Sequence, residues 1–247
     1  MRIAPGISML TLEMNVLGRR SEIHPALLYD DQHAVLVDVG MPGQLDAIRA
    51  AMAAEGVPFE RLDGVILTHQ DIDHIGAIRE VLGAASWPVT VYAHAEDRPY
   101  IEGKKPLLKW SEQRLAKVLE QVPEPMRDRI RAFFQNPPSA EVTHVVEDGE
   151  VLPIAGGVQV IFTPGHTPGH ISLYHLPSKT LIAGDATTCE GGRILGPSPQ
   201  ATEDMARATA SHRRFADLDV AQVICYHGGL CANDVASQLQ AWGGASG

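Results

Sequence analysis

The chain has 247 residues, 45% of them hydrophobic and 20% charged, so it can bury a globular core as one domain over residues 1–247. Its formal net charge of −10 argues against a general nucleic-acid-binding surface, which needs clustered Lys and Arg. It has no run of about 20 apolar residues, so we expect no membrane partner. Three cysteines without zinc-finger spacing, and an N-terminus unlike a signal peptide, favour a reduced, cytoplasmic protein.

The first third of the chain is predicted to alternate between strands and helices. Apolar, β-branched runs separated by turn signals such as Asp30-Asp31 indicate strands, and apolar residues at helical spacing before Gly56 indicate a helix. In chain order we expect strands over 7–16 and 26–39, a helix over 43–55, and strands over 62–67 and 89–93. This order predicts a mixed α/β architecture.

Residues 95–136 differ in character and are predicted to form a helical insertion. Apolar residues at helical spacing predict one helix over 107–122, ended by Pro123 and Pro125, and a second over 126–134. The segment holds nine Lys and Arg against seven Asp and Glu, so it is a cationic part of an acidic chain. We interpret it as an insertion with solvated faces. The alternative is that it caps an active site and offers cations to an anionic substrate.

The last third of the chain is again predicted to combine strands and helices. We expect strands over 142–146, 158–162, 171–175, 180–183 and 221–225, and helices over 203–216 and 231–242.

One stretch places four metal-capable side chains within six positions, directly after an apolar run: Thr68-His69-Gln70-Asp71-Ile72-Asp73-His74. On a strand, residues two apart share a face, which predicts that His69, Asp71 and Asp73 converge. Gln70 and Ile72 are then expected to point away. The alternative is that Asp73 caps a following helix and that the histidines are incidental.

Several other predicted strands end in the same kinds of residue: Asp38, His166, Asp185 and His227. If these strand ends share a sheet edge, their side chains form a cluster of carboxylates and imidazoles large enough for two metals. Such mixed ligands suit Zn, Fe or Mn, whereas Ca and Mg prefer nearly all oxygen.

Four motifs, in order and over nearly the whole chain, resemble those of the metallo-β-lactamase superfamily: 68–74, Thr163-Pro164-Gly165-His166-Thr167-Pro168-Gly169-His170, Gly184-Asp185 and His227-Gly228-Gly229. The resemblance implies an α/β fold, a four-layer αββα sandwich with metals at one edge between two sheets. It also implies the metal ligands, which are His69, Asp71 and His166 for a first metal, Asp73, His74 and His227 for a second, and Asp185 as a bridge. By the same resemblance Asp38 supports the ligands from behind, and His94 and His170 have orienting or structural roles.

Asp71 departs from the family pattern His-x-His-x-Asp-His, where a second His is usual. Flavodiiron oxygen reductases, an iron branch of the superfamily, have Glu there. A carboxylate in place of a neutral imidazole lowers the formal charge of a two-metal site by one, which favours harder ions. The family implies two divalent metal ions, with Zn the usual one, and Asp71 favours Mn or Fe.

The resemblance implies a lactonase-like or esterase-like hydrolase with a small-molecule substrate. A hydroxide bridging two metals would attack an ester, lactone or related carbonyl, and Asp73 or Asp185 would move the proton to the leaving group. The alternative is an iron-dependent redox enzyme, dioxygenase-like or flavodiiron-like, which Asp71 favours. Cys189 is interpreted as a buried thiol rather than a nucleophile. Exposed aromatic residues such as Trp110 leave a homodimer open.

Overall fold

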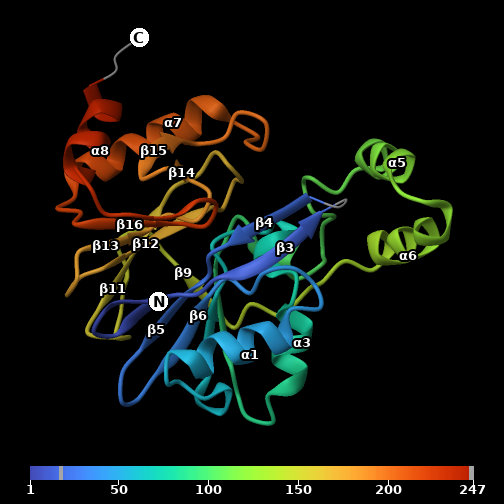
Figure 1. Cartoon of the computed structure of the whole chain (residues 1–247), viewed down its shortest axis with the longest axis horizontal. Coiled ribbons are helices and arrows are strands. Elements are labelled where there is room, and N and C mark those ends of the chain that lie inside the picture. The colour runs from blue at the N-terminus through green and yellow to red at the C-terminus, as the bar shows by residue number, and fades with distance from the viewer. Residues whose placement is uncertain (17–18, 245–247) are drawn as a thin grey trace.

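Two β-sheets lie face to face between two layers of helices in the computed structural model, which describes residues 1–16 and 19–244 (Figure 1). Apolar side chains from both inner faces interdigitate in the centre, among them Val35 and Val37 from one sheet and Leu173 and Ile182 from the other. Burying these faces against each other is what makes the two sheets pack. The predicted αββα sandwich is therefore confirmed.

The first sheet has the strand order β1-β2-β5-β6-β7-β8-β9. Its strands are β1 (Arg2–Ala4), β2 (Ile7–Met9), β5 (Ala26–Tyr29), β6 (Ala34–Val37), β7 (Gly64–Ile66), β8 (Thr90–His94) and β9 (His144–Val146). From β6 to β9 the neighbouring strands run parallel, so their carboxyl ends meet at one edge.

The second sheet has the order β10-β11-β12-β13-β16-β17. Its strands are β10 (Val151–Leu152), β11 (Val158–Phe162), β12 (Ile171–His175), β13 (Thr180–Ile182), β16 (Gln222–Cys225) and β17 (Gly229–Cys231). The strand β13 pairs in parallel with β16, and β11 shares their direction because β12 runs antiparallel to both of its neighbours. These three strands therefore also end at one edge of the sheet.

Helices cover the outer face of each sheet (Figure 1). The first sheet is covered by α1 (Leu45–Ala54), η1 (Phe59–Arg61) and α3 (Ile78–Ala84), and the second by α7 (Met205–Arg213), η2 (Arg214–Asp217) and α8 (Val235–Gly244). The helix α1 buries Ile48 and Met52, which recur at helical spacing, against the first sheet. Phe215 of η2 and Leu239 of α8 are buried against the second sheet.

Two hairpins lie outside the main sheets, and the sequence analysis predicted neither. They are β3 (Leu12–Val16) with β4 (Arg19–Ile23), and β14 (Thr188–Glu190) with β15 (Arg193–Gly196). The single strand predicted over 7–16 is wrong, because β2 and β3 pair in different sheets. The Gly191-Gly192 turn has positive φ at both residues, 57° and 79°, a signature of a two-residue hairpin that the sequence did contain.

The predicted helical insertion contains α4 (Arg98–Ile101), α5 (Glu112–Gln121) and α6 (Glu124–Gln135). Figure 1 shows α5 and α6 standing out from the rest of the molecule. The first helix of the insertion was predicted to begin at residue 107, but α5 begins five residues later. Leu107 is buried and the Leu108 N–H donates to the Gln70 side chain, so these residues belong to a loop. Pro125 lies in the first turn of α6, where proline is favoured, rather than ending a helix.

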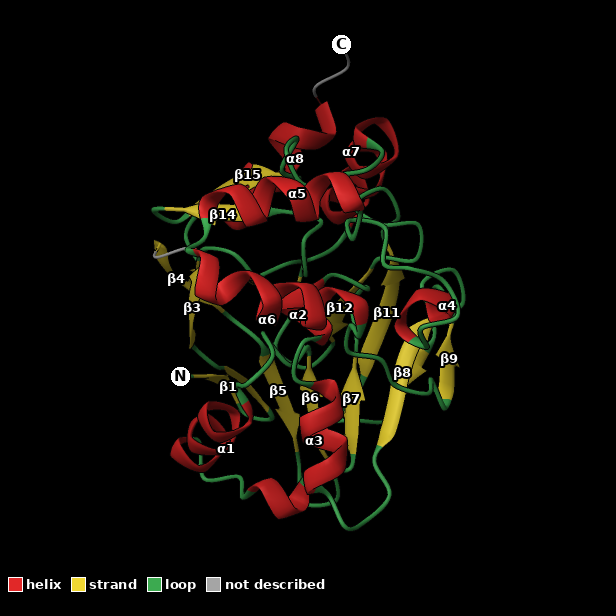
Figure 2. Ribbon diagram, turned by 90° about the vertical axis from the view of Figure 1, so that its right-hand side faces the viewer, coloured by secondary structure: helices red, strands yellow, loops and turns green. Residues whose placement is uncertain are grey.

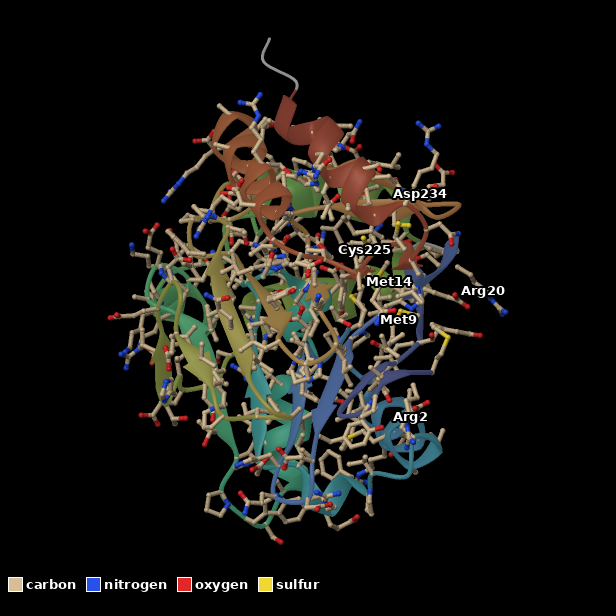
Figure 3. The ribbon with its side chains drawn as sticks, turned by 90° about the vertical axis from the view of Figure 1, so that its left-hand side faces the viewer. Arg2, Met9, Met14, Arg20, Cys225 and Asp234 are labelled. Carbon is tan, nitrogen blue, oxygen red and sulfur yellow. The ribbon has the colours of Figure 1, made fainter. Side chains whose placement is uncertain are left out.

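Three further predictions concern the surface and the thiols. Cys189, Cys225 and Cys231 are free and buried, as expected for Cys189, and Cys225 lies in the interior in Figure 3. Trp110 stacks on Phe134 at 4.6 Å between ring centroids, so part of the aromatic surface considered for a homodimer contact is covered within the chain itself. Among the described residues, no helix combines the length and the apolar character needed to cross a bilayer.

His212 on α7 makes stability depend on pH. Its ring is buried against Phe215 and Trp242, and neither ring nitrogen has a hydrogen-bond partner within the described chain. Burial therefore lowers the pKa of His212 from 6.5 to about 4. Between pH 4 and pH 6.5, His212 binds a proton more readily in the unfolded chain than in the folded chain. The free energy of unfolding therefore decreases as the pH falls below about 6.5.

A His212→Leu variant is expected to lose less stability than the wild-type protein between pH 7 and pH 5. The difference should reach about 2 kcal/mol at pH 5, because each pKa unit corresponds to about 1.4 kcal/mol. Urea unfolding of both proteins at each pH measures it, and the effects of the other titratable residues, which the two proteins share, cancel in the comparison. Parallel pH profiles for the two proteins would show that His212 is not the responsible group.

Candidate metal centre

The 68–74 stretch is a loop that turns into a helix, not a continued strand. The strand β7 ends at Ile66, and α2 (Ile72–Ile75) begins directly after Asp71. The prediction that His69, Asp71 and Asp73 share one strand face is therefore wrong, although their side chains do converge. Asp73 lies within α2, so it is not the helix cap, and within the described chain the Asp71 side chain makes no capping hydrogen bond.

The seven predicted ligands lie in two adjacent groups. In the first cluster, one ligand atom from each of four residues lies within 4.8 Å of the others: His69, Asp71, His166 and Asp185. The second cluster is formed in the same way by Asp73, His74 and His227. The Asp185 carboxylate lies between them, with Oδ2 3.4 Å from His166 Nε2 and 3.5 Å from His227 Nε2. The structure thus brings together every residue of the predicted set, in the predicted grouping.

Strand ends explain why residues so far apart in the sequence meet. His166 follows β11, Asp185 follows β13 and His227 follows β16, three strands that end at the same edge of the second sheet. His69 follows β7 at the corresponding edge of the first sheet. The expectation that parallel strands would gather these side chains therefore describes the site correctly.

Asp38, directly after β6, sets the orientation of one histidine in each cluster. Its Oδ2 accepts from His74 Nδ1 at 2.8 Å and from the Thr68 hydroxyl at 2.8 Å. Since the Thr68 hydrogen is used in that bond, the Thr68 oxygen accepts from His69 Nδ1 at 3.0 Å. Both rings therefore carry hydrogen on Nδ1 and turn Nε2 toward the site.

His170 holds the backbone of Asp185 and does not face the site as a ligand. Its Nε2 accepts the Asp185 N–H at 2.9 Å, and its Nδ1 lies 2.9 Å from the Thr163 hydroxyl. Burial, followed by the neighbouring His69 and His166, lowers the pKa of His170 well below its usual range, so the ring stays neutral. Gly184 has φ 54°, and a Cβ there would lie 2.8 Å from His170 Nε2, so glycine is required.

The residues fit a bound divalent metal. Three buried atoms of the two clusters have no hydrogen-bond partner within the described chain: His69 Nε2, His74 Nε2 and Asp185 Oδ1. Buried polar atoms nearly always form hydrogen bonds, so several buried nitrogens and oxygens without one around a single position indicate a cation site. Imidazole nitrogens with carboxylate oxygens are the donor set of Zn, Mn and Fe sites.

The carboxylates give the centre a strong negative field. Burial lowers the pKa of His227, but Asp185 and Asp73 outweigh it and raise that pKa to about 10. Burial raises the pKa of Asp71, but His69, His166 and Lys109 outweigh it and hold that pKa well below its usual range. The protein thus keeps its carboxylates ionised around a position suited to a cation.

Asp97 joins the two loops that carry the first-cluster ligands, and the sequence analysis did not identify it. This fully buried carboxylate accepts from the Gln70 N–H at 3.0 Å, the Thr167 hydroxyl at 2.8 Å and the Gly169 N–H at 2.8 Å. Burial raises the pKa of Asp97 despite these bonds. Gln70 points away from the clusters, as predicted, because its side chain bonds to Asp97 and to the Leu108 N–H.

Two further residues at the site also escaped the sequence analysis. The Lys109 ammonium contacts Asp71 Oδ2 and lies 2.7 Å from His166 Nε2. Tyr226 stacks on His74 at 3.8 Å between centroids, and its hydroxyl donates to the Asp73 carbonyl. His94, in contrast, stacks on Phe162 at 4.0 Å and belongs to neither cluster.

A pocket of about 280 Å³ opens over the two clusters. The walls combine ligand carboxylates with apolar residues and one lysine: Asp71, Ile72, Asp73, Leu107, Lys109, Trp110, Asp185, Gln200, Ala201 and His227. Leu107, Lys109 and Trp110 come from the loop before α5, a helix that lies with α6 on the side of the molecule facing the viewer in Figure 2. The 95–136 segment therefore does contribute a cation to the pocket, through this loop.

Comparisons with known proteins find similar sequences and structures over most of the chain. The sequence model of the metallo-beta-lactamase superfamily matches residues 22–227. The chain is 34% identical over 241 residues to the probable metallo-hydrolase YflN of Bacillus subtilis, covering 91% of this chain and 84% of YflN. It is 29% identical over 205 residues to a hydroxyacylglutathione hydrolase of Alkalilimnicola ehrlichii, covering 82% of this chain and 60% of that protein. The crystal structure of the metallo-beta-lactamase family protein TTHA1429 of Thermus thermophilus matches with a TM-score of 0.72 at 24% identity, covering 98% of this chain and 79% of that one.

Proposed function

Because the chain belongs to the metallo-β-lactamase superfamily and its relatives include metallo-hydrolases, we propose that it is a binuclear metal-dependent hydrolase of an ester, a lactone or a related carboxylic derivative. The observation that supports this most strongly is the convergence of buried imidazole nitrogens and carboxylate oxygens in two adjacent clusters, with no hydrogen bond within the described chain at His69 Nε2, His74 Nε2 and Asp185 Oδ1. We assign the first metal to the first cluster and the second metal to the second cluster, with Asp185 shared. Their nearest polar neighbours are other members of the same clusters, at 3.3 Å for His74 with Asp185 and for His69 with Asp71, as expected for side chains gathered around a cation.

A divalent metal in such a site supplies Lewis acidity and makes hydroxide available from water near neutral pH. The protein's own residues then orient the substrate and move protons. Asp73 and Asp185 both line the pocket, so either carboxylate can accept a proton and return it to the leaving group. Leu107 and Trp110 offer apolar surface beside them, which suits a small organic substrate.

Asp71 bears on which metals are bound. Its carboxylate belongs to the first cluster, where Oδ2 lies 2.9 Å from His166 Nε2 and 3.3 Å from His69 Nε2. A third carboxylate lowers the positive charge of the loaded site, so we propose that Mn or Fe binds alongside Zn.

The purified protein is expected to contain up to two divalent metals per chain, with Mn or Fe present besides Zn, and to lose hydrolysis on chelation. Elemental analysis measures the content. A screen of lactones, esters and hydroxyacylglutathione, with Mn-, Fe- and Zn-loaded protein, measures activity. His166→Gln should lower metal content, whereas the control His94→Gln, outside both clusters, should not. Metal-independent hydrolysis, or an iron form that consumes oxygen but hydrolyses nothing, would contradict the proposal.

A further inference from the structure

The first cluster already contains a cation from the chain itself. The Lys109 ammonium contacts Asp71 Oδ2 and lies 2.7 Å from His166 Nε2. These are two of the atoms that would bind the first metal. An ammonium donates hydrogen bonds to the same lone pairs that a metal would use, so the two cations compete for one position.

The loop that carries Lys109 is fixed in place. The neighbouring Leu108 N–H donates to Gln70 Oε1 at 2.8 Å, and Gln70 in turn donates to the buried Asp97 through its own N–H and its side chain. Gln70 stands between the ligands His69 and Asp71, so the lysine loop is attached to the ligand loop itself. The Lys109 side chain is only 13% exposed, which distinguishes it from an ordinary surface lysine.

Both clusters pair carboxylates with histidines, but among the ion pairs of the described residues the lysine pair belongs to the first cluster. Asp73 Oδ2 lies 3.2 Å from His227 Nε2, and Asp185 Oδ1 lies 3.3 Å from His74 Nε2. A metal entering there meets imidazole and carboxylate ligands, whereas a metal entering the first cluster must also move the Lys109 ammonium away from Asp71 and His166.

We propose that Lys109 is a tethered competitor for the first metal, so that the two positions fill in sequence, the second cluster first and the first cluster only when the Lys109 ammonium is displaced into the pocket. The pocket that Lys109 lines, about 280 Å³ in volume, has room for the displaced group. This inference rests on the proposed assignment of the two metal positions. It makes Lys109 a residue that sets metal occupancy, and it predicts a form of the protein with one metal per chain.

Titration of the metal-free protein with Co²⁺, followed by calorimetry and by visible absorption, tests this without relying on activity. The wild-type protein should bind two ions in separate steps. In Lys109→Met the weaker step should tighten by about 10- to 100-fold, the range expected when a charge-assisted hydrogen bond at the ligands is removed. Lys105→Met, a lysine exchange in the same loop that lines no part of the pocket, should titrate like the wild type.

A second measurement keeps the test independent of any variant. Mass spectrometry after brief acetylation should show Lys109 in the wild-type protein reacting faster once the second equivalent of Co²⁺ is bound, with Lys105 unchanged. Equal affinities for both ions in the wild type, an unchanged weaker step in Lys109→Met, or no change in Lys109 labelling would overturn the inference while leaving the hydrolase proposal intact. A wild-type protein that binds no Co²⁺ at all would overturn both.

Discussion

Asp185→Ala is expected to lower kcat/KM by at least about 10³-fold and to reduce metal retention in both clusters. The carboxylate lies between the clusters, with one oxygen 3.3 Å from His74 Nε2 and the other 3.4 Å from His166 Nε2. Its removal leaves both positions short of a ligand and takes away a candidate proton acceptor in the pocket. Metal content by elemental analysis, and steady-state kinetics on whichever substrate the screen identifies, measure the two effects.

The matched control is Asp219→Ala, which removes a carboxylate at an exposed ion pair with Lys179, away from the pocket. That variant should keep the wild-type metal content and rate. An Asp185→Ala protein that retains two metals and comparable activity would show that the carboxylate is not shared between the clusters.

Asp97→Ala is expected to destabilise the protein by about 3 kcal/mol and to weaken metal binding at the first cluster by about 10- to 100-fold. Removing this buried acceptor leaves the Gln70 and Gly169 N–H groups without their partner. It also releases the loop that carries His69 and Asp71 from the loop that carries His166. Urea unfolding of the metal-free protein measures the first effect, and Co²⁺ titration measures the second.

For comparison, Asp148→Ala removes a half-exposed carboxylate whose partners are Arg214 and the Phe162 N–H, away from the pocket. It should cost less stability and leave Co²⁺ affinity unchanged. If Asp97→Ala lowers stability but the first cluster binds Co²⁺ as before, Asp97 has a structural role only and does not position the ligands.

Much of the site was readable from the sequence because its residues follow apolar strands directly. Asp38, His166, Asp185 and His227 each stand within a few residues of a strand end, and the sheet pairing gathers those ends at one edge. This gathering does not depend on the exact local conformation. The prediction of a strand through 68–74 was wrong, but the predicted grouping of the His and Asp side chains in that stretch did not depend on it.

The residues that sequence analysis missed act through contacts that no local pattern records. Asp97 lies at the start of α4, yet its partners are Gln70 and Thr167, 27 and 70 positions away. Lys109 lies among apolar residues that were predicted to be helical, but the neighbouring Leu108 N–H bonds to Gln70 and the Lys109 side chain reaches the first cluster. Such contacts depend on how separate loops meet, which periodicity and composition do not specify.

The hydrogen bonds of Asp38 couple the two clusters, which limits how substitutions can alter one cluster without the other. One carboxylate orients His74 of the second cluster directly and His69 of the first cluster through Thr68. A substitution at Asp38 would thus disturb the ring orientation in both clusters at once, directly at His74 and through Thr68 at His69. Adjustment of the first cluster by itself falls to groups that contact its own side chains, and Lys109, which contacts Asp71 and His166, is one of these.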